Sequence, residues 1–210
     1  MINETAFYPG GRGLWLYDKT DVFPKILVLG QDFSTEKYYY DFLNKRKKDT
    51  DSPTWKNLIK LFNEASINMQ NCFFSNVFMG LRKTDSMTGK FPGLKDQEFK
   101  KRNIEYLKYQ IEIIKPRLII TLGKFAAELL SSAANKGLEN WSHFKALRLE
   151  ENALKYNVIF GEHSCTCLAI NHPSMRHLNI KRCKYKDCVG NDAEIMMLKD
   201  AVIGSERGIL

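Results

Sequence analysis

The sequence predicts an α/β fold, a three-layer α/β/α sandwich around a central, mainly parallel four-stranded sheet. Two observations support this prediction: short runs of β-branched and aliphatic residues recur along the chain, and segments with helical periodicity separate them. Strands that alternate with helices imply right-handed crossovers, which place helices on both faces of the sheet. The predicted strands are residues 25–30 (KILVLG), 72–78 (CFFSNVF), 117–123 (RLIITLG) and 167–172 (CLAINH).

These four runs are continuously apolar and do not alternate between apolar and polar residues. Continuous apolar runs are typical of parallel strands that are covered on both faces. In such a sheet the functional residues are expected at the edge where the strands end. The residues that follow each run therefore decide the functional interpretation.

Four helices are expected between and after these strands. Thr54, which follows Pro53, can cap the first helix, in which apolar residues return at helical spacing. Pro116 ends the second helix before the third strand begins. The predicted helices cover residues 54–66, 96–114, 123–135 and 193–202.

Length and composition indicate one soluble domain that covers residues 1–210. The chain is 44% hydrophobic and 27% charged, and no apolar run approaches the roughly 20 residues that a membrane span needs. The N-terminal segment MINETAFYPGGRG lacks both the basic start and the apolar stretch of a signal peptide. We therefore expect a cytoplasmic protein.

The five cysteines are an odd number in a chain without an export signal, which favours reduced thiols. The last four fall in two pairs, but neither pair has the two-residue gap that is typical of zinc sites. The first pair is expected on or just before a buried strand, and the second in a basic loop. We therefore expect no metal and no cofactor. The cysteines are Cys72, Cys165, Cys167, Cys183 and Cys188.

Basic residues outnumber acidic residues by 32 to 24, which gives the chain a net charge of +8. The excess gathers in residues 44–48, 100–102 and 176–186. Clusters of this kind suit a polyanion such as a nucleic acid. They are also compatible with solvated, lysine-rich faces, so charge alone does not identify the partner.

A carboxylate follows the first strand directly. The strand leads into Gly30, Gln31 and Asp32, where the glycine permits a tight turn and a close approach of the backbone to a ligand. Asp32 can orient or activate a water molecule at this place. The alternative is that Asp32 only shapes the turn or caps the next segment.

The second and fourth strands end in an amide and an imidazole. Asn76 offers a donor and an acceptor, which can read a base edge or hold a neighbouring loop. His172 precedes Pro173, and proline favours an extended conformation for the residue before it. A single histidine here can equally be a core residue bonded to backbone. The third strand ends at Gly123, which opens a helix and permits close packing or an anion contact.

The segment after His172 mixes apolar and cationic side chains. Such a mixture suits a loop that wedges into a base stack and holds phosphates. The residues expected to contact DNA are Ser174, Met175, Arg176, Leu178, Lys181 and Arg182.

Taken in order, four motifs at the strand ends resemble the uracil-DNA glycosylase superfamily. They are GQD after the first strand, an Asn in the second, LGKFAA after the third and HPS after the fourth. The resemblance runs from about residue 25 to 179 and includes the helix TWKNLIKLFNEASI. Gln31 and Asp32 match the motif that activates water, and His172 begins the HPS of the second active-site motif. Asn76 stands where this superfamily has the Asn that reads uracil.

The resemblance implies a protein that flips a base out of DNA and hydrolyses its N-glycosidic bond in base excision repair. Asp32 and His172 would be catalytic. The carboxylate stabilises the sugar cation and positions water, while the neutral imidazole donates a hydrogen bond to the departing base. Gln31, Asn76 and Phe33 would bind the base, with the tyrosines of the YYY run as further candidates for the stacking ring. Single- or double-stranded DNA is the expected partner, and a monomer is the expected state.

The sequence departs from the family pattern in two places. FST at 33–35 stands where the best-known uracil-specific branch has Pro-Tyr-His, so uracil or another deaminated or damaged base is the implied substrate. HPS is followed by Met175 where Pro is common, which leaves Met175 and Leu178 as alternative wedge residues. The cysteine pattern of the iron–sulfur branches is absent.

Two other functions are compatible with the sequence. One is a member of the same superfamily that binds a nucleic acid or a nucleobase without cleaving it. The other is an unrelated α/β enzyme that acts on a small ligand. The second alternative predicts that Asp32, Asn76 and His172 do not face one pocket.

Overall fold

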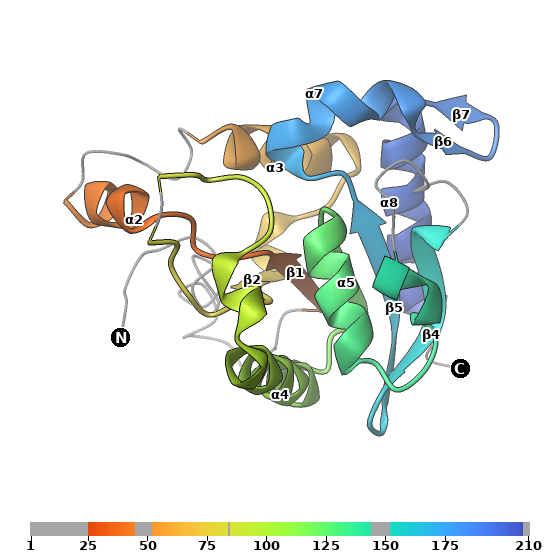
Figure 1. Cartoon of the computed structure of the whole chain (residues 1–210). Coiled ribbons are helices and arrows are strands. Elements are labelled where there is room, and N and C mark those ends of the chain that lie inside the picture. Colours follow the sequence, from red (N-terminus) through yellow and green to blue (C-terminus); the bar gives the residue numbers. More distant parts are fainter. Residues whose placement is uncertain (1–24, 45–51, 84, 144–151, 208–210) are drawn as a thin grey trace.

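The computed structural model describes residues 25–44, 52–83, 85–143 and 152–207 (Figure 1). Its central sheet has five strands in the order β2-β1-β3-β5-β4. The prediction of a mainly parallel sheet is confirmed, whereas the predicted number of four strands is wrong. The strands are β1 (Ile26–Gly30), β2 (Cys72–Asn76), β3 (Leu118–Leu122), β4 (Leu154–Phe160) and β5 (His163–Ile170).

The four strands expected from the sequence are all present, and they run parallel to one another. Every residue of β1, β2 and β3 is buried, as the continuous apolar runs predict. Gly30 pairs in register with Asn76, and Leu122 pairs with Ile170. The last residues of these strands therefore lie beside one another at one edge of the sheet.

The strand that the sequence did not predict is β4, which runs antiparallel to β5 at the border of the sheet. Its central residues, Tyr156 and Asn157, are exposed, and the register shifts between Lys155 and Val158. A half-exposed, irregular border strand lacks the apolar signal of a buried strand. Because β4 pairs with the start of β5, β5 begins at His163, four residues before the predicted start at 167.

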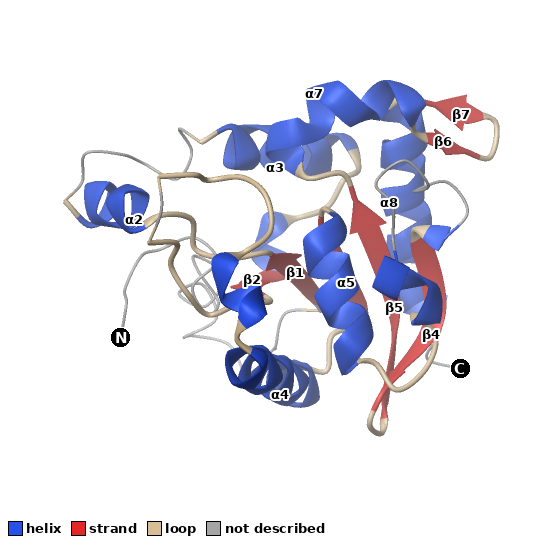
Figure 2. Ribbon diagram, viewed as in Figure 1, coloured by secondary structure: helices blue, strands red, loops and turns tan. Residues whose placement is uncertain are grey.

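Helices cover both faces of this sheet (Figure 2). Trp55 of α3 (Pro53–Glu64) packs against Phe74 of β2, with ring centroids 5.0 Å apart. The next residue of the strand, Ser75, donates a hydrogen bond of 3.1 Å to Gln110 on the opposite face. Consecutive residues of a strand point to opposite faces, so α3 and α4 lie on opposite sides. The other large helices are α4 (Gln97–Ile114) and α5 (Lys124–Ala133), which pack together, and α8 (Asn191–Arg207), which lies behind the sheet in Figure 1.

The N-cap of helix α3 lies two residues earlier in the chain than the sequence predicts. Ser52, and not Thr54, is its N-cap: the Ser52 hydroxyl accepts a hydrogen bond of 3.2 Å from the backbone N–H of Trp55. Pro53 occupies the first helical position, where its missing N–H costs nothing. The two hydroxyls are two residues apart, and only the extended backbone of Ser52 fits a cap.

The other predicted helices are present with small differences at their ends. Asp96 caps α4 by accepting the backbone N–H of Phe99 at 3.0 Å, and Lys115, with φ of 46°, ends it before Pro116. Helix α5 is shorter than predicted, and α8 extends further at both ends. Short elements outside the predicted set are α2 (Glu36–Leu43), α7 (Arg176–Asn179), β6 (Lys184–Tyr185), β7 (Cys188–Val189), and 3₁₀ turns that include η6 (Pro173–Met175) and η7 (Ile180–Arg182).

Among the described residues, no helix combines the length and the apolarity that a membrane crossing requires.

The capping geometry predicts different costs for two neighbouring substitutions. Ser52→Ala removes the acceptor for the Trp55 N–H and should lower the free energy of unfolding by about 1 kcal/mol. Thr54→Ala is the matched control, because Thr54 lies inside the first turn, and it should change that free energy by less than about 0.5 kcal/mol. Urea denaturation measures both values. An equal cost for the two variants would contradict the assignment of the cap.

Candidate functional site

A pocket of about 420 Å³ lies at the edge where the parallel strands end. Asp32 after β1, Asn76 at the end of β2 and His172 after β5 all line it. The three predicted residues therefore share one pocket, which argues against the unrelated α/β enzyme considered from the sequence. A second cavity of about 250 Å³ shares His172 with the first and reaches the start of α5 at Gly123.

Asp32 sits in a tight turn that its own carboxylate closes. Its Oδ1 accepts a hydrogen bond of 2.8 Å from the backbone N–H of Ser34, which has a left-handed φ of 73°. Backbone bonds of 3.0 and 2.9 Å join Gly30 and Gln31 to Val77 and Phe78, which continue β2. Asp32 therefore shapes the turn, as one reading of the sequence expects, and it also lines the pocket, while its action on a water molecule stays a prediction.

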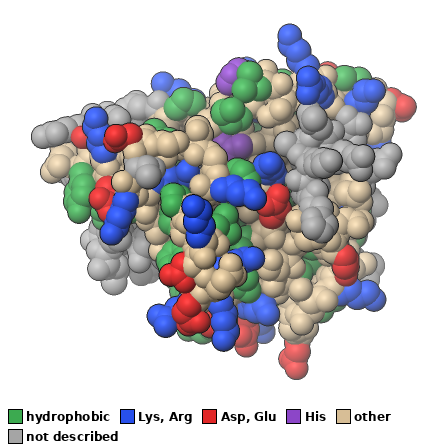
Figure 3. Space-filling model, in the orientation of Figure 1, with side chains coloured by type: hydrophobic (Ala, Val, Ile, Leu, Met, Phe, Trp, Pro, Cys, Tyr) green, Lys and Arg blue, Asp and Glu red, His purple; other side chains and the backbone are tan. Residues whose placement is uncertain are grey.

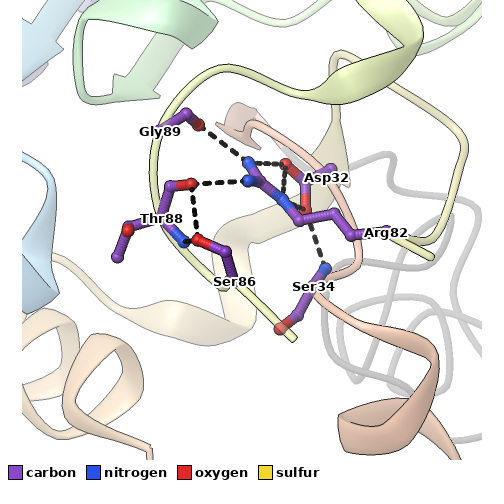
Figure 4. A network of polar contacts seen from close by, with 6 residues as sticks. All are labelled: Asp32, Ser34, Arg82, Ser86, Thr88 and Gly89. Carbon is purple, nitrogen blue, oxygen red and sulfur yellow. Dashed lines mark hydrogen bonds and ion pairs between the residues drawn. The ribbon is translucent and has the colours of Figure 1, made fainter. Parts of the chain in front are cut away.

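The main partner of Asp32 is Arg82, which sequence reasoning missed. Arg82 Nη2 lies 2.7 Å from Asp32 Oδ2, and Nε lies 3.1 Å from each carboxylate oxygen (Figure 4). The two side chains are only 5% (Asp32) and 3% (Arg82) exposed. Nothing in the sequence separates Arg82 from the many surface cations, because its partner lies fifty positions earlier in the chain.

Asn76 closes the pocket at the end of β2. It is 1% exposed and pairs in register with Gly30, directly before the Asp32 turn. A buried amide in this place combines a donor and an acceptor in a polar group that lines the pocket. Its position suits the predicted contact with a base edge.

Gln31 lines the same pocket, but its amide serves a neighbouring loop. In the orientation that satisfies both of its polar atoms, the nitrogen donates to Gly89 O at 3.3 Å and the oxygen accepts from Phe91 N at 2.8 Å. These bonds hold the loop that follows Arg82 against the first strand end. A contact of Gln31 with a base stays a prediction, and its observed role is to fix that loop.

His172 is extended, with φ of −59° and ψ of 124°, as Pro173 predicts. Burial lowers the pKa of its imidazole from the ordinary value of 6.5, and the nearby charge of Asp32 opposes this only in part. His172 Nδ1 lies 2.8 Å from the hydroxyl of Ser174. When Ser174 donates to Nδ1, the ring proton is on Nε2, which is the tautomer that can donate a hydrogen bond.

Gly123 is needed where β3 turns into α5 beside His172. It has φ of 84°, and a Cβ atom placed on it would lie 3.0 Å from the Cβ of His172. A side chain here would therefore displace the imidazole or strain the backbone. Of the two roles that the sequence leaves open for Gly123, the structure supports close packing.

Several aromatic rings are available for stacking on a bound base. Phe33, as predicted, and Tyr38 and Tyr39 of the YYY run line the pocket, whereas the third tyrosine, Tyr40, is exposed and does not. Trp55 of α3 also lines the pocket. Among the described residues, four aromatic rings of the pocket are therefore candidates for the predicted stacking on a base.

The segment after His172 stands above the end of β5 as η6, α7 and η7 (Figure 1). Asn57 of α3 donates a hydrogen bond of 2.8 Å to Pro173 O and holds this segment in place. Met175 and Leu178 are 39% and 57% exposed, which suits a wedge. Met175 also lines the pocket, whereas Leu178 does not.

Of the three cations predicted to contact phosphates, Arg176 forms an ion pair inside the protein. Its Nε lies 2.5 Å from Glu194 Oε2, and its Nη2 donates to Asn191, both in the first turn of α8. Glu194 is fully buried, so Arg176 neutralises a buried charge. A phosphate contact of Arg176 stays a prediction, as do those of Lys181 and Arg182, which are exposed. On the face shown in Figure 3, Lys and Arg side chains are spread widely and do not form one patch.

All five cysteines are free thiols, and Cys165 and Cys167 lie on β5 with their sulfur atoms 4.0 Å apart. Cys188 belongs to the small β6–β7 hairpin. Within the described ranges, no group of three or more His, Cys, Asp or Glu side chains is arranged to hold a metal ion.

The ion pair of Arg176 predicts a loss of stability on substitution. Arg176→Gln leaves the carboxylate of Glu194 buried without its charge partner and should lower the free energy of unfolding by about 3 kcal/mol. Arg182→Gln is the control at an exposed site and should change it by less than about 0.5 kcal/mol. Chemical denaturation of both variants tests this. Equal stability of the two variants would contradict the assignment of Arg176 as the charge partner of a buried Glu194.

The buried imidazole of His172 predicts that stability falls as the pH drops below 6.5. In that range the unfolded chain takes up a proton at His172, while the folded state, with its lowered pKa, does not. His172→Asn should therefore flatten the loss of stability between pH 6.5 and 5.

His163 provides the opposite control, because its hydrogen bond with Cys165 raises its pKa above 6.5. Its contribution is present below pH 6.5 and is lost above it, so His163→Asn should change only the slope above that pH. Urea denaturation across a pH series measures both slopes. An unchanged slope below pH 6.5 in His172→Asn would contradict the assignment of a neutral, buried imidazole.

The family comparison agrees with the geometry. Residues 18–193 match the model of the uracil DNA glycosylase superfamily, a span that includes all five strands and every residue assigned to the pocket. A comparison with curated proteins gave no match. The chain belongs to the uracil DNA glycosylase superfamily.

Proposed function

We propose that this protein is a DNA glycosylase that hydrolyses the N-glycosidic bond of uracil, or of another deaminated base, in DNA. The observation that carries the proposal is the convergence of Asp32, Asn76 and His172 in one pocket from three separate strand ends. Membership of the superfamily supports glycosylase chemistry. The pocket lies at the strand edge, and a base reaches such a pocket only when it is rotated out of the helix.

The three groups have complementary roles in breaking the bond between sugar and base. As this bond stretches, the sugar becomes cationic and the base becomes anionic. The carboxylate of Asp32 stabilises the cation, and Asn76 pairs with the edge of the base. The neutral imidazole of His172 donates a hydrogen bond to the developing oxyanion, and a preorganised donor of this kind contributes about 3 kcal/mol.

The surface next to the pocket suits a DNA strand that has lost one stacked base. Met175 and Leu178 present exposed apolar side chains that can fill the gap, and Lys181 and Arg182 carry positive charge on the same segment. The net charge of +8 adds a general attraction for the phosphate backbone. Such a protein would act in base excision repair.

A panel of oligonucleotides tests the proposal. Single- and double-stranded oligonucleotides that carry uracil, hypoxanthine or xanthine are incubated with the protein and then treated with alkali, which cuts the chain at abasic sites. Wild-type protein should produce strand scission on at least one of them. Asp32→Ala and His172→Ala should each lower the single-turnover rate on that substrate by about 100-fold or more.

Asp187→Ala is the matched control, because Asp187 is an exposed carboxylate in the turn between β6 and β7, and its rate should equal that of wild type. Absence of scission on every oligonucleotide would refute the glycosylase. Salt-sensitive binding without scission would instead identify a member of the superfamily that binds DNA without cleaving it.

A further inference from the structure

We infer that Arg82 is a positioning residue, which fixes the carboxylate of Asp32 in the orientation that it has in the pocket. This inference rests on the proposed glycosylase function and assigns a role to one further residue of the same site. It starts from the ion pair between Asp32 and Arg82, which both line the pocket.

Both carboxylate oxygens of Asp32 accept hydrogen bonds. Its Oδ1 accepts from the backbone N–H of Ser34 at 2.8 Å. The single proton of Arg82 Nε is shared between Oδ1 and Oδ2, each 3.1 Å away, and Oδ2 also accepts from Nη2 at 2.7 Å. Three N–H donors on two sides therefore fix the orientation of the carboxylate.

Arg82 is held as firmly as the carboxylate that it binds. Its Nη1 donates to Thr88 O at 2.8 Å and its Nη2 to Gly89 O at 2.9 Å, so the guanidinium joins Asp32 to the loop over the pocket (Figure 4). The backbone N–H of Arg82 donates to Ser34 O at 2.8 Å, directly after the Asp32 turn. Release of Asp32 would therefore require several bonds to break together.

The arrangement depends on the shape of the guanidinium as well as on its charge. The planar fork of arginine contacts both carboxylate oxygens and two carbonyl oxygens at fixed angles. The ammonium group of lysine is a single point of charge and cannot reproduce all of these contacts. The ring of Phe91 lies 6.0 Å from the guanidinium carbon and completes the enclosure.

A fixed, buried carboxylate suits a reaction in which positive charge develops on the sugar. Groups that are already oriented before the reaction stabilise a transition state without reorganisation, and burial strengthens their effect. Displacement of such a group by about 1 Å can cost about 100-fold in rate. Arg82 would therefore influence the rate through Asp32 without contact with the reacting atoms.

Single-turnover kinetics on the best substrate of the oligonucleotide panel tests the inference. Arg82→Met should lower the cleavage rate at saturating enzyme by about 100-fold, while the Kd for the oligonucleotide changes by less than about 3-fold. Arg82→Lys keeps the charge and lacks the fork, so it should fold and still lose about 10-fold in rate. The double variant Asp32→Asn/Arg82→Met should cleave no more slowly than the single variant Asp32→Asn, because Arg82 acts only through Asp32.

A purely structural role for Arg82 would instead slow cleavage by the same factor in the wild-type and the Asp32→Asn backgrounds, which would overturn the inference. If Arg82→Met does not fold, the rate of Arg82→Lys decides, and a wild-type rate in that variant overturns the inference.

These outcomes separate the two proposals. Cleavage by wild type together with unchanged rates in both Arg82 variants would refute the positioning role and leave the glycosylase intact. Absence of cleavage by wild type on the whole panel would refute both.

Discussion

The parallel register of the four buried strands is the constraint on which the rest of the structure depends. Paired parallel strands run in the same direction, so residues that follow their ends meet although they are far apart in the sequence. Gly30 lies beside Asn76 in this register, and the same edge carries Asp32 and His172. Backbone pairing thus forms the frame of the pocket, and the loops add groups to a frame that already exists.

Two buried ion pairs stabilise the charged groups at this edge. Asp32 pairs with Arg82 inside the pocket, and Glu194 pairs with Arg176 below the segment that follows His172. Because the removal of two charges from water offsets most of their attraction, such pairs add little net stability. Their effect is geometric: each one fixes a carboxylate and joins two parts of the chain that are distant in sequence.

The sequence predicts the parallel strands, the helices between them and the three residues of the pocket, because buried runs and the polar residues at their ends are local signals. The sequence does not predict the border strand β4, because only two of its seven residues are buried. The cap of α3 is not predicted because Ser52 and Thr54 are both suitable residues, and only the backbone conformation selects one. The ion pairs of Arg82 and Arg176 are not predicted for a different reason. The partner of each arginine is distant in the sequence, and only tertiary folding brings the two side chains together.

Glu194 has a consequence for the motions of the molecule. Its Oε1 accepts from the backbone and the side chain of Asn171 at 3.1 and 3.3 Å, while its Oε2 binds Arg176, so one side chain of α8 holds both sides of His172. Elements joined by buried bonds open together as one cooperative unit. The loop above the pocket and the first turn of α8 therefore share one opening equilibrium, and amide protons in the two segments should exchange with solvent at coupled rates.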